Sequence, residues 1–277
     1  MEGEFTPAPE WKTGLITSAL TPQSRIIQFA VVDGQAIFEG DIILGTVDEV
    51  EGSLLVVSEA VTQGGIESGV VVPAERRWPG GTIPYEMPVD LGQRVPDAIA
   101  HWEAHTCIRF VSRTTEPDYV VFRQATANCS ARVGKKAGGG PQDINLGPEC
   151  SVGNVIHEIG HAVGLWHEQS REDRDLWVEI VWSNIDPFYT HNFDQHITDG
   201  DDVGAYDYAS VMHYPRDAFS INGSDTIIPR TTLPPGVTMG QRDGLSENDK
   251  KTVKAMYTSI CPPALLADTP DATLVTP

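Results

Sequence analysis

One short stretch of the sequence has the residue types and the spacing of a metal site. His157 and His161 are four residues apart, so on a helix both imidazoles lie on one face, one turn apart. Such a pair supplies two nitrogen ligands to a single Zn²⁺. Gly164 follows three residues later, and a positive φ at that position would end the helix and turn the chain. The turn would bring His167 to the same ion from another direction.

Glu158 stands directly after the first histidine, where its carboxylate would lie close to the ion without binding it easily. A carboxylate in that position can take a proton from a water that the metal activates, which is the role of a general base. Three protein ligands also leave one coordination position open, as in catalytic zinc sites, whereas structural sites are closed by four ligands. We therefore expect one catalytic Zn²⁺ per chain.

The composition argues against two classes of function. The 277 residues include 39 acids and 19 bases, for a net charge of −20, and this acidic excess argues against a general nucleic-acid binder. The sequence has no apolar run of about 18 residues, so we expect no membrane span. Met1–Phe5 lacks the charged and apolar regions of a signal peptide. Either a signal was removed, or the sequence begins downstream of one.

All four cysteines and all eight histidines lie after residue 70, which indicates that the N-terminal segment has a different task from the rest of the chain. An even number of cysteines without a C-x-x-C pattern favours two disulfides and an oxidising compartment. The alternative is four buried thiols in a cytosolic protein. Three pairings are possible among Cys107, Cys129, Cys150 and Cys261.

Hydrophobic periodicity and turn residues outline the secondary structure. We expect helices over residues 96–105, 152–166 and 247–257, and strands over 108–111 and 119–122. The N-terminal segment has a polar lead at 1–20, β-rich runs at 26–27, 42–44 and 54–57, and a linker-like composition at 62–69. Residues 262–277 contain Pro and Thr without a pattern, which favours a flexible tail.

The pattern H-E-x-x-H-x-x-G-x-x-H is that of the metzincin zinc proteases. In this sequence it continues through Glu168–Asp175, and Ser210–Tyr214 lies downstream. Together these segments resemble the astacin family, and Thr106–Phe110 is similar to the family's first cysteine segment. The resemblance spans about Trp78 to Cys261.

The resemblance implies an α+β fold, with a metzincin/astacin-like catalytic domain of two subdomains split by the active-site cleft. The upper subdomain would contain a twisted mixed sheet with two helices, and the lower one would be mostly irregular with a C-terminal helix. We therefore divide the chain into an inhibitory propeptide (residues 1–69), an astacin-like zinc protease domain (70–261) and a flexible C-terminal tail (262–277).

The resemblance also implies roles for residues near the metal. Met212 would form the tight methionine turn under the zinc, and the plainer interpretation, core packing, agrees with that role. Tyr214 would be a further zinc ligand at rest and would swing away to hydrogen-bond the oxyanion, because a phenol beside developing negative charge stabilises it. The implied disulfide pairs are Cys107 with Cys261 and Cys129 with Cys150.

Phe38–Asp41 is similar to the F-x-G-D element of astacin zymogens. In those zymogens the aspartate, here Asp41, coordinates the zinc and displaces the catalytic water. An anionic oxygen is a suitable ligand for Zn²⁺. The alternative is an ordinary β-turn.

Glu168 corresponds to the glutamate that, in the family, pairs with the α-amino group of the mature N-terminus. A buried carboxylate without a cation is costly, so a new ammonium group made by proteolysis is a suitable trigger. The alternative is an exposed carboxylate at a helix end. By alignment the mature start falls near Gly69. Arg76 and Arg77 also form an attractive trypsin-like cleavage site, but a cut there would shorten the buried arm, and the sequence leaves this conflict open.

Arg242 lies in a segment, Met239–Ser246, that resembles one in which many astacins place an arginine beside the residue after the scissile bond. That arginine favours Asp or Glu at this substrate position. Met239 replaces the family's usual isoleucine. The alternative is a solvated arginine.

The other histidines are expected to have no catalytic role. His101 and His105 have the ligand spacing, but Trp102 stands where the base should be, so we expect both on a helix surface. His191 and His196 lie in a loop-like region and are expected to be solvent-facing or structural.

The sequence thus predicts a secreted zinc metalloendopeptidase, made as a zymogen that a propeptide aspartate blocks. Its partners would be polypeptide substrates with Asp or Glu after the scissile bond and an activating protease, and we expect a monomer. The alternatives are a catalytically idle zinc-binding or adhesion module on the same fold, and a zinc amidase or other hydrolase with similar ligands.

Overall fold

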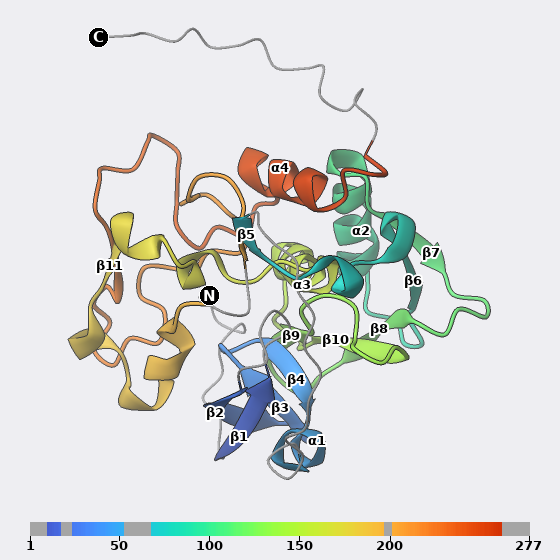
Figure 1. The fold of residues 1–277 in the computed structure, drawn as a ribbon, viewed down its shortest axis with the longest axis horizontal. Coiled ribbons are helices and arrows are strands. Elements are labelled where there is room, and N and C mark those ends of the chain that lie inside the picture. Colours follow the sequence, from blue (N-terminus) through green and yellow to red (C-terminus); the bar gives the residue numbers. More distant parts are fainter. Residues whose placement is uncertain (1–9, 18–23, 53–67, 197–200, 262–277) are drawn as a thin grey trace, which may run out of the picture.

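The computed structural model describes residues 10–17, 24–52, 68–196 and 201–261 (Figure 1). The expected tail at 262–277 and the β-rich run at 54–57 lie outside the described residues. Within the described part of the chain, no helix is long and apolar enough to cross a membrane.

The N-terminal segment folds into four antiparallel strands in sequence order and one short helix, which we call the N-terminal module. Its elements are β1 (Trp11–Thr17), β2 (Ser24–Val32), β3 (Gln35–Phe38), β4 (Ile42–Thr46) and α1 (Val47–Gly52). Asp33 and Gly34 join β2 to β3 with φ of 48° and 79°, as a two-residue hairpin turn with two positive φ angles requires. Two small apolar clusters stabilise the module, one around Phe29 and Val50 and the other around Ala30.

The strands of the module continue the sheet of the main domain. Ile42 of β4 pairs in parallel with Ala131 of β9 (Cys129–Ala131), and the amide of Ala131 donates to the carbonyl of Asp41 at 2.9 Å. Nine of the described strands therefore form one sheet, in the order β1-β2-β3-β4-β9-β10 (Pro141–Leu146)-β8 (Tyr119–Gln124)-β6 (Thr82–Glu86)-β7 (Arg109–Ser112). In Figure 1 the blue strands lie beside β9 and β10, below α3.

The first half of the main domain supplies the rest of this mixed sheet and two helices. Its elements are β6 (Thr82–Glu86), α2 (Arg94–His105), β7 (Arg109–Ser112), β8 (Tyr119–Gln124), β9, β10 (Pro141–Leu146) and α3 (Val152–Val163). β9 is antiparallel to β10, whereas the remaining pairs are parallel. The buried indole of Trp102 on α2 donates to the carbonyl of Ile156 on α3 at 3.0 Å, so the two helices are fixed to each other.

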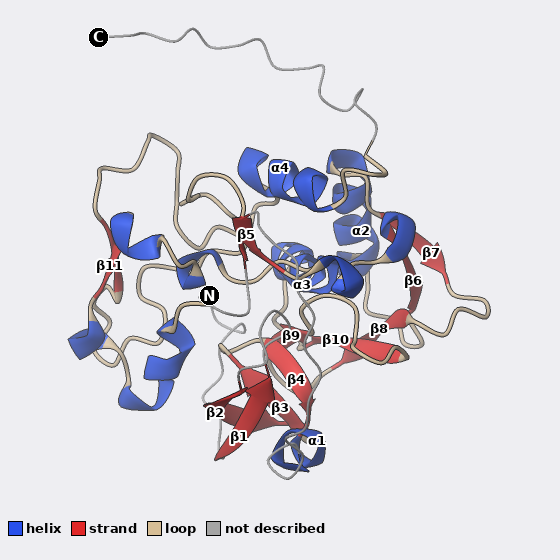
Figure 2. Cartoon of the chain, in the orientation of Figure 1, coloured by secondary structure: helices blue, strands red, loops and turns tan. Residues whose placement is uncertain are grey.

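The second half is mostly loops and short 3₁₀ helices, as Figure 2 shows on the left of the molecule. Its regular elements are β11 (Val178–Ile180), β12 (Asp201–Asp202), β13 (Ile227–Pro229) and the closing helix α4 (Glu247–Met256). The 3₁₀ helices of the domain are Ala74–Arg76, Pro79–Gly81, Glu168–Ser170, Arg174–Leu176, Trp182–Asn184 and Pro187–Phe193. A separate apolar core includes Phe193 and Tyr214. This arrangement confirms the predicted α+β fold.

Two disulfides connect distant parts of the main domain. Cys107, after α2, is bonded to Cys261, after α4, and Cys129 of β9 is bonded to Cys150, just before α3. These are the two pairs that the resemblance implied. The Cys129–Cys150 bond connects β9, the strand that pairs with β4 of the N-terminal module, to the start of α3.

The predicted helices form with small differences at their ends. α3 ends at Val163 instead of residue 166, because Gly164 has a φ of 120° and its amide donates back to the carbonyls of Gly160 and His161. The linker expected at 62–69 is partly wrong, because Ser68–Val71 forms β5 and pairs with β12. The polar lead at 1–20 is also wrong in part, because Trp11–Thr17 forms β1.

Candidate metal centre

Helix α3 fixes the first two histidines of the motif. The hydroxyl of Ser151 accepts from the amide of Asn154, and the side chain of Asn154 accepts from the amide of Ser151, which caps the helix start. Gly160 on the same helix leaves room for Met212, because a Cβ atom there would lie 2.5 Å from the methionine sulfur. The buried methionine therefore packs directly against the metal-binding helix.

Three histidines and one aspartate meet at one buried point. Oδ2 of Asp41 lies 3.2 Å from Nε2 of both His157 and His167, and Oδ1 lies 3.5 Å from Nε2 of His161. All four side chains have no exposed surface. Their possible ligand atoms lie within 4.8 Å of one another, and in the described part of the chain no other group of three or more His, Cys, Asp or Glu is placed to hold a metal.

The far side of each imidazole determines which nitrogen can bind a metal. Each Nδ1 faces an oxygen acceptor, at 2.7 Å from Val211 O for His157, 2.8 Å from Leu165 O for His161 and 2.8 Å from Glu39 Oε2 for His167. A carbonyl or carboxylate oxygen only accepts, so each Nδ1 carries the hydrogen. When the three rings are neutral, their Nε2 lone pairs face Asp41, and a cation bound between them would satisfy all four groups.

The remaining polar atoms support the same interpretation. Nε2 of His161 and Oδ1 of Asp41 are buried, and neither forms a hydrogen bond within the described residues. Buried polar atoms of this kind call for an explanation such as an ion. Three imidazoles and one carboxylate are the ligand types that Zn²⁺ prefers. The residues present therefore fit zinc.

A tight turn in the N-terminal module brings Asp41 to this point. Glu39 and Gly40 join β3 to β4 with φ of 48° and 82°. A non-glycine residue in the left-handed region costs about 1 kcal/mol or more, so the contacts of Glu39 must offset that cost. The pairing of β4 with Ala131 then holds Asp41 beside β9.

Glu39 is a site residue that the sequence did not reveal. Its buried carboxylate lies 2.7 Å from Nε2 of His196, 2.8 Å from Nδ1 of His167 and 3.4 Å from the hydroxyl of Ser170. Burial raises the pKa of this carboxyl, but His196 and His167 outweigh it and lower the pKa to about 2. Glu39 is thus an anion held by the wall of the metal site. His196, expected to be solvent-facing or structural, is fully buried as one partner of this anion.

The other predicted site residues lie around this cluster. The Tyr214 ring lies 4.6 Å from the ring of His167, and its hydroxyl donates to the carbonyl of Glu39 at 2.5 Å. Glu158 is fully buried on α3, next to the first ligand. The roles of Tyr214 and Glu158 in catalysis stay predictions.

Glu168 begins the 3₁₀ helix that follows the third histidine, and it lies among several acids. Its Oε1 accepts from the amide of Asp207 at 2.7 Å, while Arg171 is 3.7 Å away and is bonded instead through two nitrogens to Asp173. Burial raises the pKa of Glu168 to about 8 although Arg171 lowers it. Burial also raises the pKa of Asp249 to about 6. This region therefore contains more buried acidic side chains than cationic side chains close to them.

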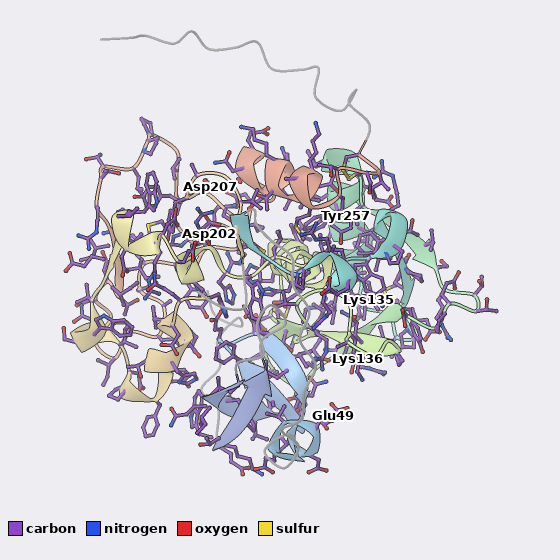
Figure 3. All side chains as sticks on the ribbon, viewed as in Figure 1. Glu49, Lys135, Lys136, Asp202, Asp207 and Tyr257 are labelled. Atoms are coloured by element: carbon purple, nitrogen blue, oxygen red, sulfur yellow. A yellow bond between two sulfur atoms is a disulfide. The ribbon has the colours of Figure 1, made fainter. Side chains whose placement is uncertain are left out.

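A small cavity lies between these acids. Its volume is about 20 Å³, enough for one group of the size of water. Its wall includes Glu168, Arg171, Ser210, Met212 and Asp249. β5 runs nearby, since its Ser68 pairs with Asp202, the neighbour of the wall residue Val203, and Figure 3 labels Asp202 next to this strand.

Arg242 braces the backbone near the methionine turn. Its guanidinium donates to the carbonyls of Val211, His213 and Gln241 at 2.8, 3.2 and 2.9 Å. Its own carbonyl packs so closely against the start of α3 that a Cβ atom on Gly153 could not fit. The expected role of Arg242 in substrate binding stays a prediction.

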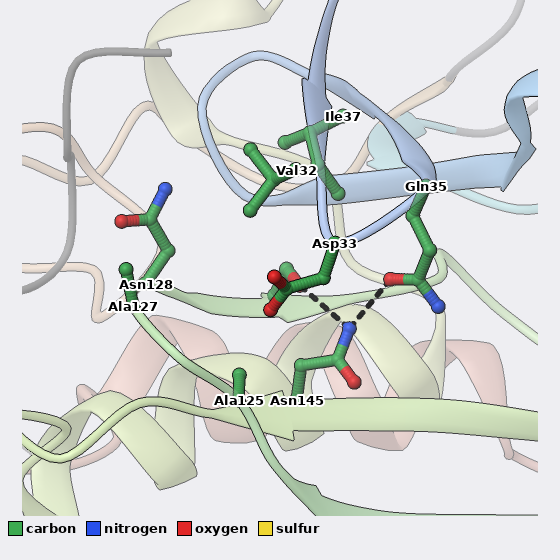
Figure 4. Close-up of a pocket in the computed structure, with 9 residues that line it drawn as sticks. Val32, Asp33, Gln35, Ile37, Ala125, Ala127, Asn128 and Asn145 are labelled. Carbon is green, nitrogen blue, oxygen red and sulfur yellow. Dashed lines mark hydrogen bonds between the residues drawn. The ribbon is translucent and has the colours of Figure 1, made fainter. Parts of the chain in front are cut away.

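The N-terminal module has a second contact with the main domain, away from the metal. The hydroxyl of Thr126 donates to Asp33 at 2.9 Å, and the amide of Asn145 donates to Gln35 at 2.6 Å. Figure 4 shows these hairpin residues around a cavity of about 10 Å³ that Asn128 also lines. The module is thus held at both its hairpin and its β3–β4 turn.

The remaining histidines form no second metal centre among the described residues. His105 is exposed on α2, and Nε2 of His101 accepts from the amide of Leu245 at 3.1 Å. His213 is buried, and its Nε2 lies 2.7 Å from the hydroxyl of Tyr206.

A metal-binding helix that ends at glycine, a third histidine beyond the turn and a methionine packed beneath define a metzincin-type metallopeptidase domain. The sequence model of the peptidase family described as Astacin matches residues 70–258. The chain therefore belongs to the astacin family.

Individual relatives agree with this membership. Tolloid-like protein 2 of Homo sapiens is 43% identical over 193 residues, which cover 66% of this chain and 19% of the relative. High choriolytic enzyme 1 of Oryzias latipes is 42% identical over 164 residues, 59% of each chain. A solved structure of this hatching enzyme zinc-protease has a TM-score of 0.58 at 35% identity and covers 71% of this chain and 98% of its own. The present chain spans about a fifth of the length of the tolloid relatives.

Proposed function

We propose that this chain is a zinc metalloendopeptidase in its precursor form. The observation that carries the proposal is the convergence of three Nε2 atoms whose partner Nδ1 atoms are all held as donors. Membership of a peptidase family supports peptide-bond hydrolysis as the reaction.

In the reaction, the chain's own residues would move protons and stabilise charge. Bound Zn²⁺ would act as a Lewis acid toward the scissile carbonyl and make water more acidic. Glu158 would take the proton of the attacking water and deliver it to the leaving amine. Tyr214, next to His167, would donate its hydroxyl hydrogen to the developing oxyanion.

The N-terminal module, within the segment proposed as a propeptide (residues 1–69), would keep the precursor inactive. Asp41 reaches all three histidines and is fully buried, so a substrate carbonyl has no access to the same point. The hydroxyl of Tyr214 also donates its hydrogen bond to the carbonyl of Glu39. Release of the module would free the metal and the phenol together.

Processing near Gly69 would supply Glu168 with a closer cation than Arg171. The cavity beside Glu168 has room for one ammonium group, and β5 already begins at Ser68. The alternative cut at Arg76-Arg77 is less suitable, because Arg76 donates to Val133 at 3.2 Å and Arg77 to Met256 at 2.8 Å. These bonds keep both arginines within the fold.

Two disulfides support an oxidising environment and hence secretion. The substrates would be polypeptides with an acidic residue after the scissile bond. The proposed chain is a monomer activated by another protease.

Zinc content and casein hydrolysis, measured on the processed protein and on Glu158→Ala, test the function. We expect one zinc per chain in both, hydrolysis that a chelator abolishes, and a loss of at least about 100-fold in the variant. An idle binding module would hold zinc without cleaving casein. A zinc amidase would cleave a small amide and leave casein intact. No stoichiometric zinc in either protein would overturn the proposal.

A further inference from the structure

We propose that three cations of the main domain, Arg76, Arg132 and Lys136, bind an acidic stretch of the substrate that lies upstream of the scissile bond in the processed enzyme. We call these three residues the basic cluster. In the precursor, the acidic helix α1 of the N-terminal module faces the same cations. The inference rests on the proposed peptidase function and adds a second binding surface to it, away from the metal.

The cations of this region stand out against the charge of the whole chain. The chain has a net charge of −20, whereas residues 119–142 contain four cations and no acid. The four cations are Arg123, Arg132, Lys135 and Lys136. A protein with such a negative net charge repels an acidic polypeptide at long range. A local basic region therefore offers that polypeptide a preferred position on the surface.

Not all of these cations are neutralised within the main domain. Arg123 and Lys135 form close ion pairs with acids of the main domain, at 2.6 and 2.9 Å. Arg132 and Lys136 form no such pair among the described residues. Arg76 lies beside them and donates to backbone carbonyls of the same loop. The basic cluster is therefore available to a carboxylate from outside the main domain.

The guanidinium of Arg132 lies where an added anion is favourable. It is half-buried, and burial together with the neighbouring Arg76 lowers its pKa, whereas Glu49 and Asp143 raise it. Asp143 is already paired with Arg123. Without the N-terminal module, Arg132 therefore has no carboxylate of its own. An arginine in such a place binds a carboxylate through strong charge-assisted hydrogen bonds.

Helix α1 supplies negative charge to this place in the precursor. Its three charged residues are all acids. A Cβ atom built on Gly45, just before the helix, would lie 2.8 Å from Oε2 of Glu49 and 3.6 Å from Nη2 of Arg132. The carboxylate and the guanidinium therefore line the same small space.

The cations also act on the carboxyl of Glu49. The amide of Thr46 has the largest effect and lowers the pKa of this carboxyl, and Lys136 and Arg132 lower it further, against the opposing effect of burial. Figure 3 labels Glu49 on the same side of the molecule as Lys136. Helix α1 thus shows how an acidic segment can lie at the basic cluster.

The course of β4 gives the distance of the basic cluster from the metal site. Asp41 meets the metal ligands, and β4 leads from there to Gly45, which lies next to Arg132. An extended strand rises about 3.3 Å per residue, so these four residues span about 13 Å. The basic cluster therefore lies beyond the substrate residues that flank the scissile bond.

The direction of β4 assigns the basic cluster to the part of the substrate before the scissile bond. β4 runs parallel to β9, starting at the pair Ile42 and Ala131. Release of the module would leave β9 with a free edge, to which an extended substrate can add as a strand. The antiparallel addition is the more stable one, and it runs opposite to β4. Acids about four to six positions before the scissile bond would then meet the basic cluster.

The first test compares matched fluorogenic peptides with the processed enzyme. Two of them share Asp after the scissile bond and differ only at the fourth to sixth positions before it, which are all Glu or all Gln. We expect kcat/KM to be about fivefold higher for the Glu peptide at low ionic strength, through a lower KM. The advantage should disappear in about 1 M salt. A third peptide, with the three Glu at the same distance after the scissile bond, should gain nothing, and a larger gain for it would overturn the assignment.

Charge variants assign the advantage to the basic cluster. Lys136→Gln should lower the Glu/Gln ratio of kcat/KM about twofold, and Arg132→Gln together with Lys136→Gln should bring it to about one. Lys136→Arg keeps the charge and should keep the ratio. The control is Lys251→Gln, an exposed cation on α4, which should have the ratio of the parent. A parental ratio in both Gln variants of the basic cluster would overturn the inference.

A binding measurement decides the inference independently of turnover. The Glu and Gln peptides are titrated against processed Glu158→Gln enzyme by fluorescence anisotropy. We expect the Glu peptide to bind about fivefold more tightly at low ionic strength, and the difference to disappear when Arg132→Gln and Lys136→Gln are added. Equal affinities of the two peptides, with or without binding of a sulfated polysaccharide, would refute the inference. If no peptide is cleaved by the parent enzyme, the proposed function fails while this comparison still stands.

Discussion

Nδ1 of His167 lies 2.8 Å from Oε2 of Glu39, a residue 128 positions earlier in the chain. The N-terminal module therefore contacts the metal site in two ways. Asp41 faces the Nε2 atoms from the side where the metal would bind, and Glu39 holds one of the ligands from behind. Partners of this second kind orient a histidine and strengthen its binding to the metal. In the proposed precursor, the module would thus block the site while keeping it assembled.

Loss of Asp41 should activate the unprocessed chain. In Asp41→Ala the three Nε2 atoms keep their positions through their Nδ1 partners, while the blocking carboxylate is gone. We expect the full-length variant to cleave a fluorogenic peptide at least about tenfold faster than the full-length parent. The intact N-terminus is verified by sequencing before and after the assay.

Asp48→Ala is the matched control, since Asp48 is an acid of the same module, away from the metal ligands. It should be as inactive as the parent. An Asp41→Ala precursor with no more activity than its parent removes the idea of an aspartate switch.

Glu39→Gln should weaken the proposed block of the metal site by the N-terminal module without abolishing it. The amide keeps the size of the side chain but offers one acceptor oxygen where His196 and His167 together need two. The loss of a charge-assisted hydrogen bond costs about 1.5–3 kcal/mol, so the basal activity of the precursor should rise roughly tenfold, to less than that of Asp41→Ala. The same peptide assay measures it. Basal activity equal to the parent would mean that Glu39 contributes nothing to latency.

The metal-binding helix could be predicted from the sequence because the residues that define it are close together in the chain. His157 and His161 are one helical turn apart, and the positive φ at Gly164 ends α3 as expected. A single short motif therefore specified the ligands. The resemblance supplied the aspartate, which the structure places beside them.

The pocket around Glu39 could not be predicted in the same way. Glu39 and His196 are 157 residues apart, and neither residue type is unusual in a turn or a loop. Their contact depends on the docking of β4 on β9, which rests on a single backbone pair at Ile42 and Ala131. The register of such a pairing is set by the tertiary structure and leaves no periodic signal in the sequence. The glutamate in the turn has a positive φ, and backbone angles are likewise not visible in a sequence.

Acid should loosen the docking of the N-terminal module through His191. This ring lies 5.3 Å from the ring of Trp11 and 6.3 Å from that of Phe38, both in the module. Burial lowers the pKa of His191 to about 4, although the one charged group acting on it, Glu39, raises it. The docked state therefore binds fewer protons than the released state between about pH 6.5 and 4, so its stability falls as the pH falls through that window.

From about pH 7.5 to 5 the loss should be about 2 kcal/mol. Tryptic release of the module, followed by mass spectrometry at several pH values across that range, measures it. His191→Phe keeps the ring contacts and should remove the part of the pH dependence that His191 contributes. His105→Phe, on the exposed face of α2, should behave like the parent. A His191→Phe protein with the parent's full pH dependence would assign the effect to other groups.

Glu168→Gln should change the Tm of the precursor and the Tm of the processed enzyme differently. In the precursor, Arg171 stays 3.7 Å from Glu168, and burial raises the pKa of Glu168 to about 8. A neutral amide keeps the acceptor for the amide of Asp207, so the Tm of the precursor should stay the same or rise. After processing, the proposed ammonium group would lose its partner. Breaking a buried ion pair costs about 3–5 kcal/mol, and for a domain of this size that lowers the Tm by roughly 6–20 °C.

Calorimetry on both forms of both proteins measures the difference. Glu172→Gln is the control, an exposed acid four residues away, and it should move neither Tm. A fall of the Tm in the precursor alone would mean that Glu168 already has its cation before processing. Equal Tm values for processed parent and processed Glu168→Gln would mean that the new N-terminus does not reach this cavity, and the mature start near Gly69 would have to be reconsidered.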